Sequence, residues 1–328
     1  MPETMNAVVV SAHGGPENLE FRRVARPAPE AGQVLVKLSV AGVNYLDVAQ
    51  RNGATALQAP FRPGVEGVGV IEALGEEVTG LVSGQRVGWL AGGQGSFSEF
   101  TVVEASKVVA IPEGIDDFTA VAALMQGFTA HYLSHDTYAL GPDDIVLIHA
   151  AAGGVGQWLT QMARLKGARV IGTVSTKAKE AVALANGAAH VIGYEGFADK
   201  VRELTGGEGA SVVYDGVGKS TFAESLRALR VRGMLVAIGA ASGPIPPLDV
   251  NSLAGLGSLA VTRPTVIHHV RTAEEISRRA SEVFGWIASG AISVPPVTHY
   301  DITQVVQAFT ALESRRTTGK LVLVHPRS

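Results

Sequence analysis

A glycine-rich turn between an apolar strand and a helix constrains the fold of this chain most strongly. The segment Ile145–His149 is apolar, the turn Ala150–Gly156 follows at once, and Val155–Lys166 then has the pattern of a helix. In a turn of this kind, Gly153 lets the backbone approach a pyrophosphate and Gly156 lets the helix pack close to the strand. The free N–H groups and the positive dipole end of the helix favour bound phosphate.

The segments around this turn make a dinucleotide site the favoured interpretation. A strand–turn–helix without a ligand is the alternative, and Ala151 stands where such turns usually begin with glycine. However, strands and helices alternate from residue 145 to residue 238, which predicts parallel strands and crossover helices in a doubly wound sheet. This is the context that a dinucleotide fingerprint requires. The other strands expected here are Arg169–Val174, His190–Ile192, Val212–Asp215 and Gly233–Ile238, and the other helices are Lys177–Ala185, Phe197–Leu204 and Ser220–Leu229.

The two ends of the chain have a different pattern. Short β-branched runs separated by glycine and proline clusters predict an irregular antiparallel β region in the first hundred residues. The last sixty residues contain helices and a final strand, and we expect them to return to this first region. A chain of 328 residues is long enough for two domains. The expected strands are Ala7–Val10, Leu19–Val24, Val34–Val40, Gly67–Leu74, Arg86–Trp89, Phe97–Val102 and Lys320–His325, and the expected helices are Asn44–Arg51, Phe118–Leu124, Phe128–Thr137, Ala273–Ala288 and Ile302–Leu312.

The composition argues against several classes of function. The net charge of −3 and an aromatic content of 6% provide neither a basic stripe nor stacking platforms, so no nucleic-acid partner is expected. The chain has no cysteine, which removes disulfides, cysteine-ligated zinc and thiol nucleophiles. The uncharged run Ile145–Ala163 approaches the length of a membrane span, but its central glycines favour a buried strand and helix. The start of the chain lacks the pattern of a secretion signal, so we expect a cytoplasmic protein with no membrane partner.

The second strand of the alternating region indicates which cofactor is bound. Enzymes that use NAD place a carboxylate at the end of this strand to hold the ribose 2′-hydroxyl. The segment Ile171–Lys179 has no carboxylate, but it has hydroxyl groups and two lysines, which suit a 2′-phosphate. The sequence therefore favours NADP(H). The alternative is that Lys177 and Lys179 only decorate the start of a solvated helix, where the dipole slightly disfavours cations.

A set of spaced motifs resembles one enzyme family along essentially the whole chain. Around the turn, the set comprises Asp144, Leu147, Ala151, Ala152, Gly153, Gly154, Gly156, Gln161 and Arg164. Matching blocks elsewhere are Ala41–Asp47, Pro63–Gly67, Gln126–Ala130, Tyr214–Gly218 and Val261–Pro264. These motifs resemble the quinone oxidoreductase/zeta-crystallin branch of the zinc-free medium-chain dehydrogenase/reductase superfamily.

The resemblance implies a fold and a domain division. It implies an α/β protein in which a Rossmann doubly wound parallel sheet, residues 125–263, is inserted into a chaperonin-10-like β-rich catalytic domain. That domain is formed by residues 1–124 and 264–328. The family also implies a homodimer, paired through the edge of the Rossmann sheet near Leu248–Val261.

The resemblance further implies the roles of individual residues toward bound NADPH. Asn44 and Thr129 are expected at the nicotinamide end, with Tyr132 as a further catalytic candidate. The pyrophosphate is expected at Gly153, Gly154 and Val155, and the 2′-phosphate and adenosine ribose at Ser175, Lys179 and Tyr194. Ile238, Gly239 and Ala240 are expected to line the nicotinamide side, and Arg263 and Lys320 are weaker candidates for cofactor contact.

The missing zinc ligands indicate the type of reaction. Zinc-containing relatives have a cysteine where this chain has Asn44, and a histidine where it has Val65. Without a Lewis acid, alcohol dehydrogenation is disfavoured, whereas a quinone accepts a hydride with little electrophilic help. We therefore expect an NADPH-dependent quinone oxidoreductase. The alternatives are an NADPH-dependent reductase of enones or enals and, from another class, a non-enzymic crystallin-like or RNA-binding protein.

Several other polar residues have competing interpretations. His131 and His135 have the spacing of a metal pair on a helix, but no third ligand is evident, so no metal is expected. Glu66 lies among glycines in an apolar run, which favours a buried carboxylate paired with an arginine. Asp215 is interpreted either as a residue on the cofactor side of the sheet or as a helix cap, and Asp47 has only a supporting role.

Overall fold

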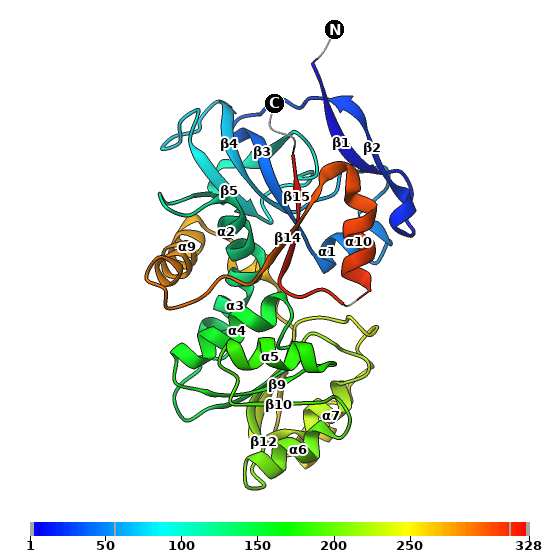
Figure 1. Ribbon diagram of the computed structural model, residues 1–328, viewed down its shortest axis with the longest axis vertical. Helices are drawn as coiled ribbons and strands as arrows, with labels where there is room; N and C mark the ends of the chain where they lie inside the picture. Colours follow the sequence, from blue (N-terminus) through cyan, green and yellow to red (C-terminus); the bar gives the residue numbers. More distant parts are fainter. Residues whose placement is uncertain (1–2, 56, 315, 326–328) are drawn as a thin grey trace. The chain divides into compact units, whose positions relative to one another are not determined.

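The computed structural model describes residues 3–55, 57–314 and 316–325 of a chain that divides into two compact units (Figure 1). Unit 1 comprises Met1–Phe128, His269–Ser289 and Val294–Ser328, and unit 2 comprises Thr129–His268 and Gly290–Ser293. The chain leaves unit 1 and returns to it a few residues later than the boundaries predicted after residues 124 and 263.

Unit 2 is built on a parallel sheet. Its strands are β8 (Ile145–Ile148), β9 (Arg169–Thr173), β10 (His190–Ile192), β11 (Ala210–Asp215), β12 (Leu229–Ala237) and β13 (Ala260–Thr262). In the described part of the chain they lie in the order β10-β9-β8-β11-β12-β13, and every neighbouring pair is parallel. The strand order reverses between β8 and β11, so the expected doubly wound sheet is confirmed, with its topological switch point between these two strands.

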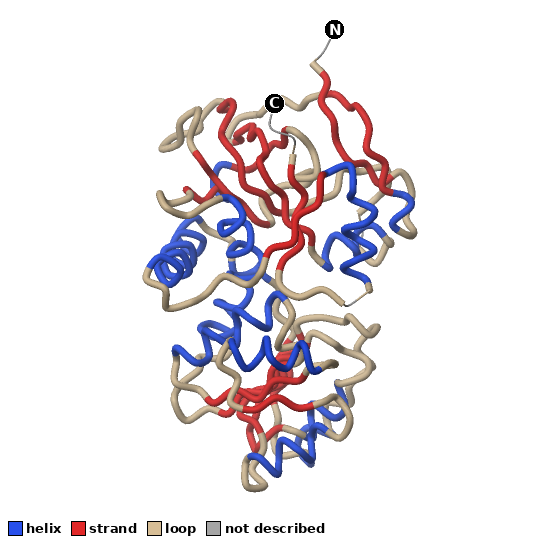
Figure 2. The backbone as a smooth tube through the Cα atoms, in the orientation of Figure 1, coloured by secondary structure: helices blue, strands red, loops and turns tan. Residues whose placement is uncertain are grey.

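Helices cover both faces of this sheet (Figure 2). The central strand β11 is buried along its whole length, as expected for a parallel strand with two covered faces. The helix predicted at Ser220–Leu229 is shorter at both ends and comprises Phe222–Arg227. Leu229 is excluded from it because this residue pairs with Ala210 as the first residue of β12. The helices of unit 2 are α3 (Phe128–Tyr132), whose first residue belongs to unit 1, α4 (Gly154–Leu165), α5 (Lys177–Ala185), α6 (Phe197–Leu204), α7 (Phe222–Arg227) and α8 (Ser252–Gly255).

Unit 1 contains a mixed sheet and a separate hairpin. The strands β1 (Thr4–Val10) and β2 (Leu19–Ala25) form the hairpin. The larger sheet contains β3 (Gln33–Val43), β4 (Glu66–Leu74), β5 (Arg86–Leu90), β6 (Phe100–Glu104), β7 (Val108–Ala110), β14 (Val297–Asp301) and β15 (Lys320–Val324). Strand β3 is its centre, because β4, β6 and β15 all pair with it in antiparallel fashion. The expected strand Phe97–Val102 begins later, at Phe100.

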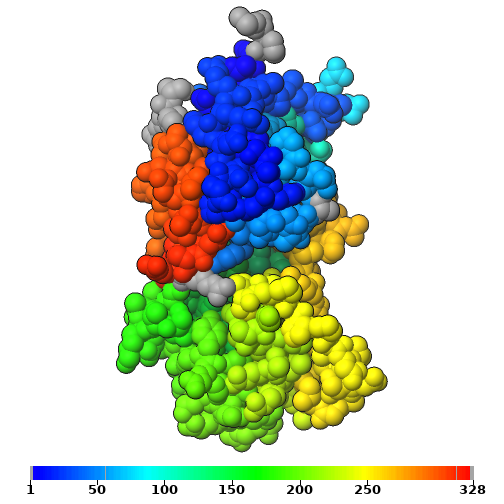
Figure 3. All heavy atoms as spheres, turned by 90° about the vertical axis from the view of Figure 1, so that its right-hand side faces the viewer, coloured from blue at the N-terminus to red at the C-terminus, as the bar shows by residue number. Residues whose placement is uncertain are grey.

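The C-terminal segment completes unit 1, as expected from the sequence. Strand β15 pairs with β3, and the helix α10 (Val305–Glu313) packs against β15. In Figure 3 the orange-red C-terminal segment lies beside the blue N-terminal segment. The Phe309 and Phe97 rings pack edge to face in the core of this unit, with their centroids 6.1 Å apart. The remaining α-helices of unit 1 are α1 (Tyr45–Arg51), α2 (Asp117–Ala122) and α9 (Ala273–Ala288).

Candidate functional site

The turn Ala150–Gly156, called the fingerprint turn below, joins β8 to α4 in unit 2. Gly153 is the N-cap of α4 and provides no side-chain cap, and the first helical hydrogen bond is donated by the Gln157 N–H to the Gly153 carbonyl at 3.0 Å. The N–H groups of Gly154, Val155 and Gly156 therefore have no carbonyl within their own helix. Gly153, Gly154 and Val155 are all partly exposed. This helix terminus fits the phosphates of a dinucleotide.

Close backbone contacts explain why small residues occupy this turn and the strand next to it. A Cβ on Gly156 would lie 2.4 Å from the Ala150 oxygen and 2.8 Å from the Ala151 Cα, so only glycine fits. A Cβ on Gly172 in β9 would lie 2.7 Å from the Ala151 Cβ. The small residue Ala151, which departs from the usual glycine, is thus accommodated because the neighbouring strand has a glycine opposite it.

The residues predicted for the adenosine end lie on the segments that follow β9 and β10. Ser175 is exposed, and Lys179 lies in the first turns of α5, where burial lowers the pKa of its ammonium group. Tyr194 follows β10, and its hydroxyl accepts the Ala150 N–H at 3.0 Å. This bond ties Tyr194 to the fingerprint turn. Since the hydroxyl oxygen accepts from Ala150, its own proton is available for a further acceptor.

The residues predicted for the nicotinamide side lie beyond the end of β12. The N–H groups of Ile238 and Gly239 both donate to the Asp215 carbonyl, at 2.8 and 3.3 Å, which fixes this segment to β11. Ile238 and Gly239 are partly exposed and Ala240 is exposed. Arg263 is also exposed, and its Nη1 donates to the Ala237 carbonyl at 2.9 Å.

Thr129 and Tyr132 lie on α3, which is continuous with π-helical turns on either side. Thr129 is partly exposed, whereas Tyr132 is 2% exposed and therefore buried. The His131 and His135 rings stack, with centroids 4.3 Å apart and planes 6° apart. The His135 Nδ1 lies 3.0 Å from the His131 carbonyl.

In unit 1, three strand ends bring Asn44, Glu66 and Lys320 together. The Asn44 Nδ2 donates to Glu66 Oε1 at 2.8 Å, and the Lys320 Nζ donates to Asn44 Oδ1 at 2.9 Å and to Glu66 Oε1. Glu66 Oε2 accepts the Met125 N–H at 2.9 Å. Because one partner of the Asn44 amide is a cation and the other a carboxylate, its orientation is determined. Gly42 belongs to this cluster, since a Cβ there would overlap Glu66 and Lys320.

This cluster changes two sequence interpretations. Glu66 is fully buried and paired, as expected, but its partner is Lys320 and not an arginine. Lys320 itself is fully buried, and its ammonium group is held by Asn44 and Glu66. This geometry favours a role in holding Asn44. No local pattern identifies Lys320 as the partner, because Glu66 and Lys320 are 254 residues apart in the chain.

Asp47 lies beside this cluster in α1. Its Oδ2 accepts the Asn44 N–H at 2.8 Å, and its Oδ1 is buried with no hydrogen-bond partner. Burial raises the pKa of the Asp47 carboxyl to about 7, and the nearby Glu66 adds to this, while the Asn44 N–H and Lys320 act in the opposite direction. A protonated carboxyl agrees with the unpartnered oxygen.

Substituting Asp47 with asparagine is expected to change how stability depends on pH. The folded state holds the Asp47 proton up to about pH 7, whereas the unfolded chain releases it near 3.8, so this group's contribution to stability falls as pH rises between these values. The difference in pKa corresponds to at most roughly 4 kcal/mol. Above pH 7 Asp47→Asn should therefore unfold at higher urea concentration than the parent, and near pH 4 the two should coincide. A constant difference across this range would contradict the assignment.

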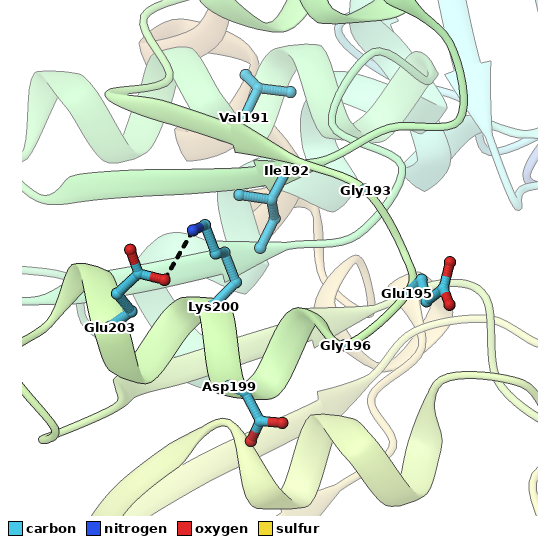
Figure 4. A pocket seen from close by; sticks show the side chains of 8 residues that line it. All are labelled: Val191, Ile192, Gly193, Glu195, Gly196, Asp199, Lys200 and Glu203. Atoms are coloured by element: carbon cyan, nitrogen blue, oxygen red, sulfur yellow. Dashed lines mark hydrogen bonds and ion pairs between the residues drawn. The ribbon is translucent and has the colours of Figure 1, made fainter.

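Unit 2 also has a shallow hollow, and no residue of the fingerprint turn lines it (Figure 4). It has a volume of about 450 Å³ and is lined by β10 and α6. Lys200 on its rim is paired with Glu203 at 2.7 Å. Its lining carries three carboxylates, which does not suit a phosphorylated ligand.

No helix in the described ranges combines the length and the apolar character needed to cross a bilayer.

Comparisons with known proteins agree with this architecture. Residues 30–113 match the family model of the alcohol dehydrogenase GroES-like domain, and residues 154–284 match that of the zinc-binding dehydrogenases. The chain is 40% identical over 317 residues to a quinone oxidoreductase of Pseudomonas aeruginosa, covering 96% of this chain and 98% of the relative. The chain belongs to the quinone oxidoreductase family of the medium-chain dehydrogenases/reductases. It is therefore an oxidoreductase, and the resemblance seen in its motifs is confirmed.

Two further relatives are named for different substrates. The chain is 37% identical over 327 residues to a 2-haloacrylate reductase of Burkholderia, covering 97% of this chain and 98% of the relative. It is 35% identical to Escherichia coli quinone oxidoreductase, whose solved structure is complexed with NADPH. That structure has a TM-score of 0.94 and covers 98% of this chain and 100% of the relative. The expected GroES-like and Rossmann fold of the quinone oxidoreductase family is thereby confirmed.

Proposed function

We propose that this protein is a zinc-independent, NADPH-dependent quinone oxidoreductase. The observation that carries the proposal is the uncapped N-terminus of α4 at the switch point of the sheet, with Ser175, Lys179 and Tyr194 on the segments next to it. The NADPH complex of the Escherichia coli relative supports the choice of cofactor. The absence of cysteine from the sequence, with Asn44 and Val65 at the expected ligand positions, supports independence from zinc.

The proposed reaction needs positioning more than electrophilic activation. When bound, NADPH supplies a hydride, and a quinone that takes up this hydride and a proton becomes a hydroquinone. We assign Gly153, Gly154 and Val155 to the pyrophosphate, and Ser175, Lys179 and Tyr194 to the 2′-phosphate and adenosine ribose. Asn44, Thr129 and Tyr132 are assigned to the reacting end, with Ile238, Gly239, Ala240 and Arg263 supporting the bound cofactor. Lys320 is assigned to holding the Asn44 amide.

The orientation of the Asn44 amide fixes what it offers a ligand. Its Nδ2 donates to Glu66 and, at 3.4 Å, to the Gly42 carbonyl, so both amide hydrogens are used, and its Oδ1, which accepts from Lys320, can offer a ligand only an acceptor. Asn44 is 9% exposed, so a small part of it reaches the surface of unit 1. We therefore propose that Asn44 accepts a hydrogen bond from the cofactor or the substrate.

An activated-alkene reductase is the second candidate, and the 2-haloacrylate reductase relative favours it. Steady-state NADPH oxidation with a panel of quinones and a panel of enones, enals and 2-haloacrylates distinguishes the two functions. Turnover of quinones with the higher kcat/KM supports the proposal. Turnover confined to conjugated alkenes would favour the second function.

Lys179→Ala is expected to weaken NADPH binding and to leave NADH binding nearly unchanged. A hydrogen bond to a charged group contributes about 1.5–3 kcal/mol, which corresponds to a loss of roughly tenfold to a hundredfold in affinity. Fluorescence titration with both cofactors measures the effect. Equal losses for NADPH and NADH would contradict a contact with the 2′-phosphate. Lys200→Ala, which removes an ammonium paired with Glu203 in the same unit, is the matched control.

We also propose that the protein pairs with a second copy through the free edge of β13. This edge strand and the preceding segment expose apolar side chains, including Val250 at 72% and Leu256 at 40%. Unpaired strand edges favour association with another strand. Light scattering coupled to size-exclusion chromatography should give twice the mass of the chain, and a concentration-independent monomer would contradict this pairing.

A further inference from the structure

A buried chain of polar side chains crosses three strand ends of unit 2. The Nδ1 of His149 lies 2.8 Å from the Thr173 hydroxyl, and its Nε2 lies 2.9 Å from the Ser225 hydroxyl. The Ser225 hydroxyl in turn donates to Asp215 Oδ2 at 2.9 Å. All four side chains are at most 4% exposed. We call Thr173, His149, Ser225 and Asp215 the strand-end tie.

The donors and acceptors of the tie are determined by Asp215. Its Oδ1 accepts the N–H groups of Val217 and Gly218, at 2.8 and 2.9 Å, and the Thr221 hydroxyl also donates to the carboxylate. Since N–H groups and hydroxyls donate to both carboxyl oxygens, Asp215 acts as an acceptor at this end of the tie. The carboxylate therefore holds the turn that precedes α7, whose N-cap is Thr221, so Asp215 is not the helix cap that was one of its two sequence interpretations.

Starting from Asp215, each proton along the tie can be assigned to one atom in turn. Ser225 has a single hydroxyl proton and gives it to Asp215, so its oxygen accepts from His149 Nε2–H. The Nδ1 of His149 is then an acceptor and receives the Thr173 proton. The ring is consequently neutral, which agrees with burial lowering the pKa of His149 to about 4 against the opposing charge of Asp215.

The tie lies where the fingerprint turn begins. His149 is the first residue after β8, and its N–H donates to the Tyr214 carbonyl of β11 at 3.0 Å, across the switch point. Ala150 has a φ of +51°, a conformation that costs energy for a residue with a Cβ and therefore needs support from its neighbours. Ala150, the first residue of the fingerprint turn and the one that follows His149 in the chain, is thus held in an unfavourable conformation.

The imidazole also supports Tyr194. The two rings stack with centroids 6.0 Å apart and planes 24° apart. The Phe197 ring packs edge-on against the His149 ring, with centroids 4.7 Å apart. The Tyr194 hydroxyl accepts the Ala150 N–H. His149 therefore contacts one partner of this hydrogen bond, Tyr194, through its ring and is the chain neighbour of the other, Ala150. His149 does not need to touch a ligand to influence where Tyr194 lies.

We propose that the strand-end tie positions Tyr194 and the fingerprint turn for the adenosine half of NADPH, with Thr173, His149 and Ser225 as positioning residues. This inference rests on the proposed function, because it assumes that NADPH binds at this turn. A tie that serves only the stability of the sheet is the alternative, and the experiment below distinguishes the two.

Two pairs of variants test the tie. Thr173→Val removes the hydroxyl at nearly constant shape, whereas Thr173→Ser retains it. Ser225→Ala removes the bridge between His149 and Asp215. The control Ser211→Ala removes another buried hydroxyl of the same unit, which accepts the Ile145 N–H at 3.2 Å at the opposite, amino-terminal end of the sheet.

The effect of each variant on cofactor affinity is measured as the dissociation constants for NADPH and NADH, by fluorescence titration. Thr173→Val and Ser225→Ala should each weaken NADPH binding by about threefold to tenfold, as expected for the loss of one hydrogen bond, and should weaken NADH binding less. Thr173→Ser and Ser211→Ala should remain within about twofold of the parent. Urea unfolding of the same variants separates an effect on binding from an effect on stability.

The outcomes that overturn the proposal are distinct from failure of the proposed function. Equal affinities in all variants, or an equal loss in Ser211→Ala, would show that the tie has only a structural role. A parent protein that shows no saturable NADPH signal would overturn the proposed function first, and this inference with it. As a direct check, nitrogen NMR should show His149 with a protonated Nε2 and a bare Nδ1 at neutral pH, and the opposite tautomer would contradict the derivation.

Discussion

Replacing Lys320 with methionine is expected to lower the free energy of unfolding by about 3–5 kcal/mol, because the substitution leaves the buried Glu66 carboxylate without its cation. Glu66 and Lys320 are both fully buried, so water cannot compensate for the lost charge. The remaining donors to Glu66, from Asn44 and Met125, are neutral. Urea unfolding followed by the fluorescence of the buried Trp89 in unit 1 measures the effect.

The double variant Lys320→Met, Glu66→Gln provides the control. Removing both charges should recover much of the lost stability, because replacing a whole buried ion pair by neutral groups is often nearly neutral. If the double variant still binds NADPH but reduces its acceptor more slowly, the pair acts by holding Asn44. A single variant as stable as the parent would contradict the description of this cluster.

Gly156→Val is expected to weaken NADPH binding by at least about tenfold, since the new side chain forces the fingerprint turn away from α4. The contact is with backbone, at 2.4 Å from the Ala150 oxygen, and a flexible side chain cannot relieve it. The turn must therefore move, and the free N–H groups of α4 move with it. NADPH titration measures this loss.

Gly285→Ala is the matched control, because a Cβ on Gly285 in α9 meets open space. This variant should bind NADPH as the parent does and should be slightly more stable, as expected for alanine in a helix. A Gly156→Val protein that is folded and binds NADPH normally would show that the fingerprint turn does not hold the cofactor.

The sequence predicted the parts of the fold that follow from local pattern. The alternation from Ile145 onward predicted a doubly wound sheet, and helices such as Lys177–Ala185 begin and end where expected. Boundaries were wrong where pairing overrides propensity. Leu229 continues a helical pattern, but its pairing with Ala210 makes it the start of β12. The short edge strand β13 was not predicted.

The sequence identified several residues of the candidate site but not the contacts between them. The fingerprint turn is contiguous, so its glycines could be assigned from their spacing. The cluster of Asn44, Glu66 and Lys320 forms from three strand ends, and no local pattern selects Lys320 from the 27 basic residues of the chain. Glu66 did give a usable signal, since a carboxylate in an apolar, glycine-rich run requires a buried partner. No local pattern pointed to the strand-end tie, because Thr173 and His149 meet only when β8 and β9 are in register, and Ser225 reaches them from α7.

Zinc-independent hydride transfer from NADPH to a quinone can be measured in a single turnover under anaerobic conditions, with and without a strong chelator. We expect the absorbance of the reduced nicotinamide to be lost at a rate that saturates with both NADPH and quinone, and the chelator to have no effect. If NADPH oxidation does not saturate, or if the chelator abolishes it, the protein is not a zinc-independent NADPH-dependent quinone oxidoreductase.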